Sequence, residues 1–395
     1  MKNTSNMKEP YIGIFNDGFP PIYDGVTLTV MNYLHWLLEK GHPSCVVTPW
    51  NPESGEYPFE VIRYFSLPIR SRHPYRYGYP KLDPFIWRKL RNTPFRIVHS
   101  HSPFSAGRLG VYVKRKQGVP LIGTFHSKYK SDLKHSFKHA PWCVPIIMRR
   151  ILNFYNACDE VWIPQASVEE TVREYGYKGP LEVVDNGIDY DLGAEGDIGS
   201  FKAEARKELN IPEKSLALLF VGQHIWEKGI GIILEALNLV RDTVDFKMSF
   251  IGDGYARKEL QQMVKKLGLE DRISILGVIR DRDLLQKYYA ASDIFIFPSL
   301  YDNAPLVVRE AAAMATPSII PQNSTASEVI RPDFNGFLTE ATAEKYAEKI
   351  RLLNGERDLV LTAGKNAKNT LVRNWEDVVD EVIDRYNKLI NRHNR

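Results

Sequence analysis

Short apolar runs alternate with segments of helical periodicity along the whole chain of 395 residues. In the first half we predict a helix over Val26–Lys40, because the apolar residues from Val30 to Leu38 recur on one face and Gly41 follows as a stop signal. The alternation predicts parallel sheets covered by helices on both faces. The strands expected in this half are Tyr11–Phe15, Cys45–Thr48, Ile97–His99, Pro120–Gly123 and Val161–Pro164.

The same rhythm restarts at Leu216–Gly222, a run apolar enough for the central strand of a second sheet. The polar segment Asp189–Ser200, rich in Gly and Asp, has the composition of an exposed connection between the two halves. Apolar residues at helical spacing from Trp375 to Ile390 predict a final amphipathic helix. We therefore predict two domains, residues 1–190 and 200–374, with residues 375–395 packing back toward the first. The remaining expected elements are a helix at Ile230–Val240 and strands at Phe246–Gly252, Ile273–Leu276 and Asp293–Pro298.

The composition, with 44% hydrophobic, 25% charged and 11% aromatic residues, is typical of a folded globular protein and excludes disordered and fibrous classes. The three cysteines, Cys45, Cys143 and Cys158, have no metal-ligand spacing and favour a reducing cytoplasm. The N-terminus lacks the apolar run of a signal peptide, and no window approaches the ~18 apolar residues of a membrane span. We expect a cytoplasmic protein that meets a membrane only from its surface.

The segment from Pro298 to Ile320 carries the most informative polar pattern. Asp302 lies in a loop after a predicted strand, and Glu310 follows eight positions later in a helix. Loop amides and a helix N-terminus between the two can donate to an oxygen-rich ligand. The carboxylates could then accept hydrogen bonds from sugar and ribose hydroxyls. The plainer interpretation is an N-cap Asp followed by a surface Glu.

Six segments in order resemble the retaining glycosyltransferases of family four. They are YDGVTLTVMNYLHWLLEKGH, VHSHSPFSAG with GTFHSKY, VVDNGID, FVGQHIWEKG, FIGDGYARKEL and PSLYDNAPLVVREA. Within the family, VHSHSPFSAGRLG, GTFHSKY and FYNACDEVWIP are most similar to the branch that glucosylates diacylglycerol. The resemblance implies the α/β GT-B fold, in which two Rossmann-like doubly wound parallel-sheet domains face a cleft. It also implies a nucleotide-diphosphate sugar as donor.

The resemblance assigns roles to individual residues. Gly25 would bring backbone amides close to the donor diphosphate, and Lys228 would stabilise the negative charge that grows on it. Asp302, where the family usually has Glu, would contact the sugar hydroxyls, and Glu310 the ribose. His126, after a strand, would lie against the transferred sugar. The further donor contacts would be Gln223, Ile279 through its backbone, and the loop of Asn303, Ala304, Pro305, Leu306 and Val307.

Two of these residues also have a structural interpretation. A lone histidine or a helix-leading lysine is often structural, so His126 and Lys228 also have that interpretation. His99 and His101 either support the first-domain loop or touch the ligand. Asn186 and Gly187 would shape a turn.

One position departs from the family pattern, because Gln223 stands where members usually carry Arg. Losing one such charge-stabilising contact costs roughly 2–4 kcal/mol of transition-state stabilisation. Either His224 or a first-domain cation compensates, or the enzyme is slow, or the chain binds its ligand without catalysis. We favour compensation, because Lys228, Asp302 and Glu310 remain in register.

Retention without an evident protein nucleophile implies front-face attack, in which the acceptor hydroxyl approaches on the side that the diphosphate leaves. A leaving phosphate oxygen would take the proton of the acceptor. Double displacement by Asp302 is the competing mechanism, because a carboxylate can serve as a glycosyl nucleophile. We predict no essential metal and no cofactor apart from the donor substrate.

The net charge of +4 conceals an uneven distribution. Residues 1–185 hold 24 Lys and Arg against 16 Asp and Glu, and the rest hold 28 against 32. Between Arg63 and Arg150 there are 19 basic residues and two acidic ones. Aromatic residues are interleaved at Tyr64, Phe65, Tyr75, Tyr77, Tyr79, Phe85 and Trp87, and Lys128, Lys130, Lys134 and Lys138 precede the apolar stretch Trp142–Ile151.

Such a surface is typical of proteins that dock on anionic lipid headgroups. Three other interpretations compete: a core helix at Val144–Phe154, charges that complement the diphosphate, and a nucleic-acid interface. We predict no nucleic-acid partner, because the family motifs account for the site and no nucleic-acid module is visible.

Together these features predict a retaining hexosyltransferase at the inner face of the cell membrane. It would move glucose from UDP-glucose to a membrane lipid hydroxyl such as that of diacylglycerol. Galactose as sugar and ceramide as acceptor are variants. The alternatives are a transferase of polysaccharide or glycoconjugate assembly with a lipid-linked acceptor, and a catalytically silent sugar-nucleotide-binding protein.

Overall fold

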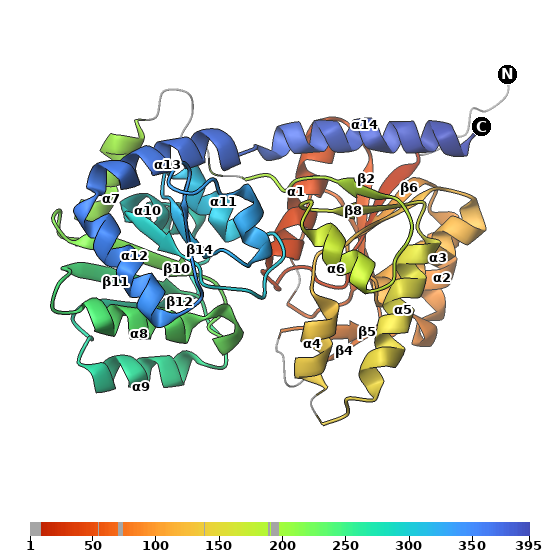
Figure 1. Cartoon of the computed structure of the whole chain (residues 1–395). Coiled ribbons are helices and arrows are strands. Elements are labelled where there is room, and N and C mark those ends of the chain that lie inside the picture. The colour runs from red at the N-terminus through yellow and green to blue at the C-terminus, as the bar shows by residue number, and fades with distance from the viewer. Residues whose placement is uncertain (1–8, 54, 70–73, 138, 189, 191–196) are drawn as a thin grey trace, which may run out of the picture. The chain divides into compact units, whose positions relative to one another are not determined.

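The computed structural model describes residues 9–53, 55–69, 74–137, 139–188, 190 and 197–395. The chain divides into two compact units, Met1–Gly187 with Asn374–Arg395 (unit 1) and Ile188–Arg373 (unit 2). Most of the expected connection, residues 189 and 191–196, lies outside the described residues. The final helix α14 (Trp375–His393) belongs to unit 1 (Figure 1).

Unit 1 contains a seven-stranded parallel sheet in the order β3-β2-β1-β6-β7-β8-β9. One buried cluster packs α1 and α14 on one face, and another packs α3 and α5 on the other, so the unit is doubly wound. Its strands are β1 (Tyr11–Phe15), β2 (Ser44–Pro49), β3 (Glu60–Tyr64), β6 (Phe95–Ser100), β7 (Leu121–Thr124), β8 (Glu160–Ile163) and β9 (Leu181–Val183), beside the hairpin β4 (Ser66–Pro68) and β5 (Arg76–Gly78). Its helices before α14 are α1 (Gly25–Glu39), η1 (Pro80–Leu82), α2 (Pro84–Asn92), α3 (Ser105–Gln117), α4 (Tyr129–Ser136), α5 (Cys143–Ala157) and α6 (Val168–Glu174).

Unit 2 contains a six-stranded parallel sheet in the order β12-β11-β10-β13-β14-β15. The central strand β10 (Leu216–Val221) is buried at all six positions, as its apolar run predicts. The other strands are β11 (Phe246–Ile251), β12 (Ile273–Gly277), β13 (Ile294–Ile296), β14 (Ser318–Pro321) and β15 (Phe337–Thr339). The helices are α7 (Ile198–Glu208), η2 (Trp226–Lys228), α8 (Ile230–Val240), α9 (Arg257–Leu267), α10 (Arg282–Ala291), α11 (Leu306–Ala313), η3 (Thr325–Val329), α12 (Ala343–Gly355) and α13 (Arg357–Leu371).

The strand order of each sheet reverses once, beside β1 in unit 1 and beside β10 in unit 2. Loops at the carboxyl ends of the strands on either side of such a reversal form the usual ligand site of doubly wound sheets. In unit 1 these loops precede α1 and α3, and in unit 2 they precede α8 and α11. The predicted residues Gly25, Lys228 and Asp302 lie in or next to these loops.

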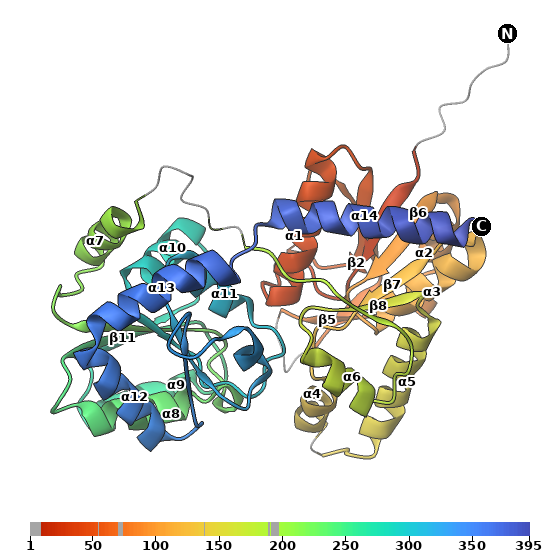
Figure 2. The same ribbon diagram turned by 45° about the horizontal axis from the view of Figure 1, so that its top comes forward.

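The helix α14 is integrated into the core of unit 1. Asn374 caps it by accepting a hydrogen bond from the amide of Asp377. Its buried face, from Val378 to Leu389, packs with α1 and β6 (Figure 2). Gly187 permits the entry of the helix, because a Cβ there would lie 2.7 Å from the α-carbon of Trp375.

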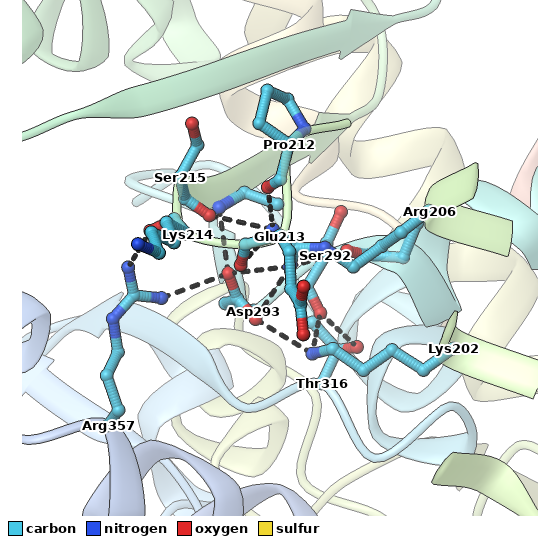
Figure 3. A network of polar contacts seen from close by, with 12 residues as sticks. Lys202, Arg206, Pro212, Glu213, Lys214, Ser215, Ser292, Asp293, Thr316 and Arg357 are labelled. Atoms are coloured by element: carbon cyan, nitrogen blue, oxygen red, sulfur yellow. Dashed lines mark hydrogen bonds and ion pairs between the residues drawn. The ribbon is translucent and has the colours of Figure 1, made fainter. Parts of the chain in front are cut away.

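A partly buried ionic network lies at the amino ends of the strands in unit 2 (Figure 3). The Asp293 carboxylate accepts hydrogen bonds from the Arg206 guanidinium at 3.0 and 3.1 Å and from the amide of Ala217 at 2.8 Å. Lys202 and Arg357 form ion pairs with it at 2.9 and 3.1 Å. Because Asp293 directly precedes β13, this network holds α7 and α13 at the amino ends of the strands, away from the carboxyl-end loops.

Candidate functional site

In unit 2, Lys228 and Asp302 form an ion pair. The Lys228 ammonium lies 2.7 Å from Asp302 Oδ1, and Asp302 Oδ2 accepts a hydrogen bond of 2.6 Å from the Ser299 hydroxyl. Gly229 makes this approach possible: its φ is +73°, and a Cβ there would lie 2.9 Å from the carbonyl oxygen of Pro298. The loops after β10 and β13 thus present one cation and one carboxylate side by side.

Glu310 is buried, with 6% of its surface exposed, in the second turn of α11. Its Oε1 accepts hydrogen bonds from both terminal nitrogens of Arg282 at 3.2 Å, and its Oε2 accepts one from the Tyr289 hydroxyl at 2.8 Å. Burial and the neighbouring Glu310 raise the pKa of Tyr289 well above its usual range, so Tyr289 remains a donor. The interpretation of Asp302 as an N-cap and of Glu310 as a surface residue is wrong. The N-cap of α11 is Pro305, and Glu310 is buried.

The other expected donor contacts lie at the same edge of the sheet. Asn303 is buried, and Ala304 and Pro305 lead from it into the first turn of α11 at Leu306 and Val307. Ile279 follows β12 and is half-buried, and Gln223 is exposed in the loop after β10. The structure therefore brings the predicted unit 2 residues to the carboxyl ends of β10, β12 and β13.

The structure does not support His224 as the residue that compensates for Gln223, and a first-domain cation remains the other predicted source of charge. The His224 side chain is fully buried, with its ring 6.2 Å from the rings of Phe220 and Phe250. Burial, together with the positive charge of Arg257, lowers the pKa of His224 to about 4. The ring is therefore neutral at pH 7 and supplies no charge to a diphosphate.

Sequence reasoning missed several residues that shape this edge. Arg257, the first residue of α9, places its guanidinium beside Gly277 at the end of β12. One of its terminal nitrogens lies 3.1 Å from the position that a Cβ would take at residue 277. Arg282, Tyr289 and Ser299 hold the two carboxylates. Arg257 lies inside the FIGDGYARKEL motif and Ser299 inside the PSLYDNAPLVVREA motif, so both had a usable signal, whereas Arg282 and Tyr289 are partners only through the fold.

In unit 1, three histidines gather at the carboxyl ends of β6 and β7. His126 is half-buried, and His99 and His101 are buried. His101 Nδ1 and His126 Nε2 lie 3.0 Å apart, and the rings of His99 and His101 are 4.1 Å apart. Burial lowers the pKa of His126 to about 4, and burial holds the pKa of His99 and of His101 well below the usual range. All three rings are therefore neutral at pH 7.

Gly25 is the first residue of α1, as expected for a residue that presents backbone amides. The preceding Asp24 caps the helix: Oδ1 accepts from the amide of Thr27 at 2.8 Å, and Oδ2 accepts from the hydroxyl of Tyr75 at 2.9 Å. By contrast, the N-terminus of α3 is closed by Asp17, which accepts from the amide of Ala106 at 3.1 Å and from the Ser105 hydroxyl. Both helices thus have a carboxylate at their N-terminus, which comes from the N-cap residue Asp24 in α1 and from Asp17 in the loop after β1 in α3.

The basic region presents apolar side chains to solvent. Phe85 is 80% exposed on α2, Trp142 is 70% exposed just before α5, and Leu82 is 66% exposed in η1. Exposed cations lie close to them along the chain at Lys81, Arg88, Lys130, Lys134, Arg149 and Arg150. The interpretation of α5 as a core helix holds for one face only, since Val144, Ile151 and Phe154 are buried. Lys138 lies outside the described residues, and no helix in the described parts is long and apolar enough to cross a membrane.

Two doubly wound units and the residues at their carboxyl edges define a class of protein, the GT-B glycosyltransferases with nucleotide-sugar donors. Residues 201–370 match the family described as glycosyl transferases group 1, and residues 23–192 match glycosyltransferase family 4. The chain belongs to glycosyltransferase family four.

Individual relatives agree with this assignment. The chain is 24% identical to an alpha-monoglucosyldiacylglycerol synthase of Acholeplasma laidlawii, over 96% of this chain and 99% of the relative. It is 25% identical to the synthase of the same name from Streptococcus pneumoniae, over 83% and 74% respectively. Its fold is similar to that of HepE from Anabaena in complex with UDP and glucose, with a TM-score of 0.74 at 18% identity, over 95% of this chain and 99% of that one.

Proposed function

We propose that this glycosyltransferase transfers glucose from UDP-glucose to a hydroxyl of diacylglycerol at an anionic membrane surface, with retention of configuration. The observation that carries the donor part is the Lys228–Asp302 ion pair beside the buried Glu310. The exposed apolar side chains within the basic region of unit 1 carry the membrane part. The names of the two synthase relatives support glucose and diacylglycerol as the specific pair.

Each donor residue has a chemical task in this proposal. Lys228 neutralises the diphosphate, whose negative charge grows as the bond from the anomeric carbon to the phosphate oxygen breaks. Asp302 accepts hydrogen bonds from sugar hydroxyls, and Glu310, held by Arg282, accepts them from the ribose. Gly25 offers backbone amides to the diphosphate. His126, being neutral, exchanges a hydrogen bond with the sugar.

The contacts of Asp302 favour front-face attack over double displacement. Both carboxylate oxygens are engaged, one by the Lys228 ammonium and one by the Ser299 hydroxyl. These contacts stabilise the negative charge and so weaken Asp302 as a nucleophile. In the front-face route the phosphate oxygen leaves with the bonding electron pair, the acceptor oxygen bonds to the same face of the carbon, and its proton passes to the departing phosphate.

The acceptor is a lipid in this proposal because the exposed groups of unit 1 suit a bilayer interface. Phe85, Leu82 and Trp142 can enter the boundary between headgroups and acyl chains, while neighbouring Lys and Arg meet anionic headgroups. Each such cation contributes about 1 kcal/mol near an anionic surface. A peripheral enzyme placed in this way reaches diacylglycerol, whose hydroxyl lies at that depth.

The decisive experiment is a matrix of donors and acceptors with mass-spectrometric detection of products. UDP-glucose, UDP-galactose and GDP-mannose are each incubated with vesicles that contain diacylglycerol, ceramide or a lipid-linked oligosaccharide, with and without anionic lipid. We expect glucosyl-diacylglycerol from UDP-glucose, with an α-linkage by NMR. A product only on the oligosaccharide would replace this proposal by a role in glycoconjugate assembly.

Gln223 favours a second candidate, a sugar-nucleotide-binding protein without catalysis, because neither Gln223 nor the buried His224 supplies a charge. This candidate predicts UDP-glucose binding without turnover on any acceptor. The Gln223→Arg variant separates the two. A loss of turnover supports a site tuned around the glutamine, whereas turnover that first appears in the variant supports the silent protein.

A further inference from the structure

The histidines of unit 1 form a connected row that begins on the final helix. Tyr386 of α14 places its hydroxyl 2.6 Å from His99 Nδ1, and the Thr124 hydroxyl lies 2.6 Å from His99 Nε2. The His99 ring packs against His101, which reaches His126 at 3.0 Å. The row thus runs from a helix close to the C-terminus to the histidine that would meet the sugar.

The tautomer of His101 follows from the surroundings of its other nitrogen. His101 Nε2 is buried and has no hydrogen-bond partner among the described residues. A neutral imidazole carries one proton, and an N–H buried without an acceptor costs more than a bare lone pair does. The proton of His101 therefore belongs on Nδ1, from which it is donated to Nε2 of His126.

The tautomer of His126 is then determined as well. Its Nε2 accepts from His101, so its own proton must lie on Nδ1. In the opposite arrangement His126 would donate from Nε2, and His101 would keep a buried Nε2–H without an acceptor. The hydrogen bond thus selects one of two tautomers.

His99 anchors the row from the other side. A phenol is a stronger acid than an aliphatic alcohol, so Tyr386 donates to His99 Nδ1 and His99 donates from Nε2 to Thr124. Tyr33 of α1 packs edge-on against both His99 and His101, at 5.6 and 5.2 Å between ring centroids. These contacts fix the plane of the ring on which His101 rests.

We propose that His101 is a positioning residue that holds His126 in the tautomer protonated on Nδ1, and that Tyr386 anchors this row from α14. In this tautomer Nδ1 of His126 is an N–H donor. The proposal rests on the proposed function only for the role of His126 toward the sugar. The tautomer itself is a property of the protein without ligand.

The first test is spectroscopic and uses the full chain labelled with 15N-histidine. Two-bond 1H–15N correlation spectra distinguish the two neutral tautomers, and the His126→Gln variant assigns the signal. We expect His126 protonated on Nδ1 at pH 7, and a loss of this preference in His101→Ala. A His126 signal protonated on Nε2 in the unmodified protein would overturn the proposal. This readout does not depend on any donor or acceptor.

The second test measures turnover of UDP-glucose with diacylglycerol vesicles. His101→Ala should lower kcat/KM about tenfold, the equivalent of one lost hydrogen bond of about 1.4 kcal/mol. His101→Asn should remain within about threefold of the parent, because its side-chain amide can donate from the position of Nδ1. Equal losses in both variants, with folding intact, would contradict the role of His101.

A matched pair of tyrosine variants tests the anchor. Tyr386→Phe removes the hydroxyl that meets His99 and keeps the ring stacked on Trp162. Tyr346→Phe removes another buried hydroxyl, one without a hydrogen-bond partner among the described residues, in unit 2. Only the first should broaden the His99 and His126 signals, and identical spectra in both variants would refute the anchoring role. If the parent protein turns over none of the donors, the proposed function fails, while the spectra still decide the tautomer.

Discussion

The Lys228 ammonium and the Asp302 carboxylate lie 2.7 Å apart, although 74 positions separate them in the chain. Their side chains are only 11% and 19% exposed. A nucleotide-sugar diphosphate that reaches Lys228 therefore meets a cation already oriented by a carboxylate. The geometry places the group suited to a leaving phosphate beside the group suited to sugar hydroxyls.

Replacing Lys228 should impair chemistry more than folding. In the proposed mechanism Lys228 stabilises the leaving diphosphate, so we expect kcat to fall by about 10²–10³ in Lys228→Ala. Lys228→Arg should retain part of the activity. Calorimetric titration should show weaker UDP binding and unchanged uridine binding, because only the former carries phosphates. Lys258→Ala, at an exposed lysine of α9, is the control, and kcat within threefold of the parent in Lys228→Ala would disprove this role.

Glu310 provides a test of ribose recognition. In Glu310→Gln the Arg282 guanidinium loses its ionic partner. In the proposed mechanism the ribose also loses a charged acceptor, so KM for UDP-glucose should rise about tenfold, which corresponds to about 1.4 kcal/mol. Donors that lack a ribose hydroxyl should bind the parent more weakly than UDP-glucose does. The variant should bind the two kinds of donor equally well. The control is Glu344→Gln, an exposed glutamate of α12. A variant that still discriminates against deoxy donors would remove Glu310 from the ribose site.

The sequence indicated the elements that are long or uniformly apolar. Ile230–Val240 was predicted with the bounds that α8 has, and β10 ends one residue before its predicted end. The edge strand β3 was missed because Glu60 and Arg63 interrupt its apolar residues, and the three-residue strands β9 and β15 carry too few residues for a pattern. Short strands depend on their neighbours in the sheet, which a local pattern does not contain.

The same distinction applies to the site. Asp302 and Glu310 could be singled out by their spacing, but Arg282 and Tyr289 reach Glu310 from a different helix. His224 was misread because adjacency to Gln223 does not fix the direction of a side chain. The packing of Phe220 and Phe250 turns this histidine inward.

The network around Asp293 predicts a specific acid sensitivity of unit 2. Burial raises the pKa of Asp293, but the positive charges of Lys202 and Arg206 outweigh it, and the net pKa is lowered. The folded state thus keeps this carboxylate ionised to a lower pH than the unfolded chain, in which the pKa of Asp is about 3.9. Its contribution to stability is fully present above about pH 4 and disappears as the pH falls through the folded pKa.

Asp293→Asn should remove this contribution and leave Arg206, whose side chain is 10% exposed, without its counter-ion. We expect a loss of roughly 3–5 kcal/mol at pH 7, the usual cost of breaking a buried pair. Urea denaturation measures this loss of stability. Hydrogen exchange of peptides from β10 measures it in unit 2. Asp271→Asn, at an exposed aspartate, should change little. A variant as stable as the parent at pH 7 would show that the network does not support the fold.

The proposed membrane-binding surface of unit 1 can be tested at its two most exposed aromatic side chains, Phe85 and Trp142. Phe85→Ser and Trp142→Ser each remove an apolar side chain that would move from water into the membrane interface. Full burial of such a side chain stabilises by about 1.5–3 kcal/mol. Partial insertion should therefore weaken vesicle binding about fivefold to tenfold per substitution, as measured by sedimentation with anionic vesicles. Leu361→Ser, at an apolar residue that is 52% exposed in unit 2, is the matched control.

The dependence of vesicle binding on ionic strength distinguishes the electrostatic contribution from the apolar contribution. Binding of the parent should weaken as the ionic strength rises, because Lys and Arg near the headgroups act through screened charges. The serine variants should keep the same salt dependence at lower affinity, since they alter only the apolar term. Equal losses in Leu361→Ser, or binding by the parent that ignores both salt and anionic lipid, would assign the basic region of unit 1 to another partner.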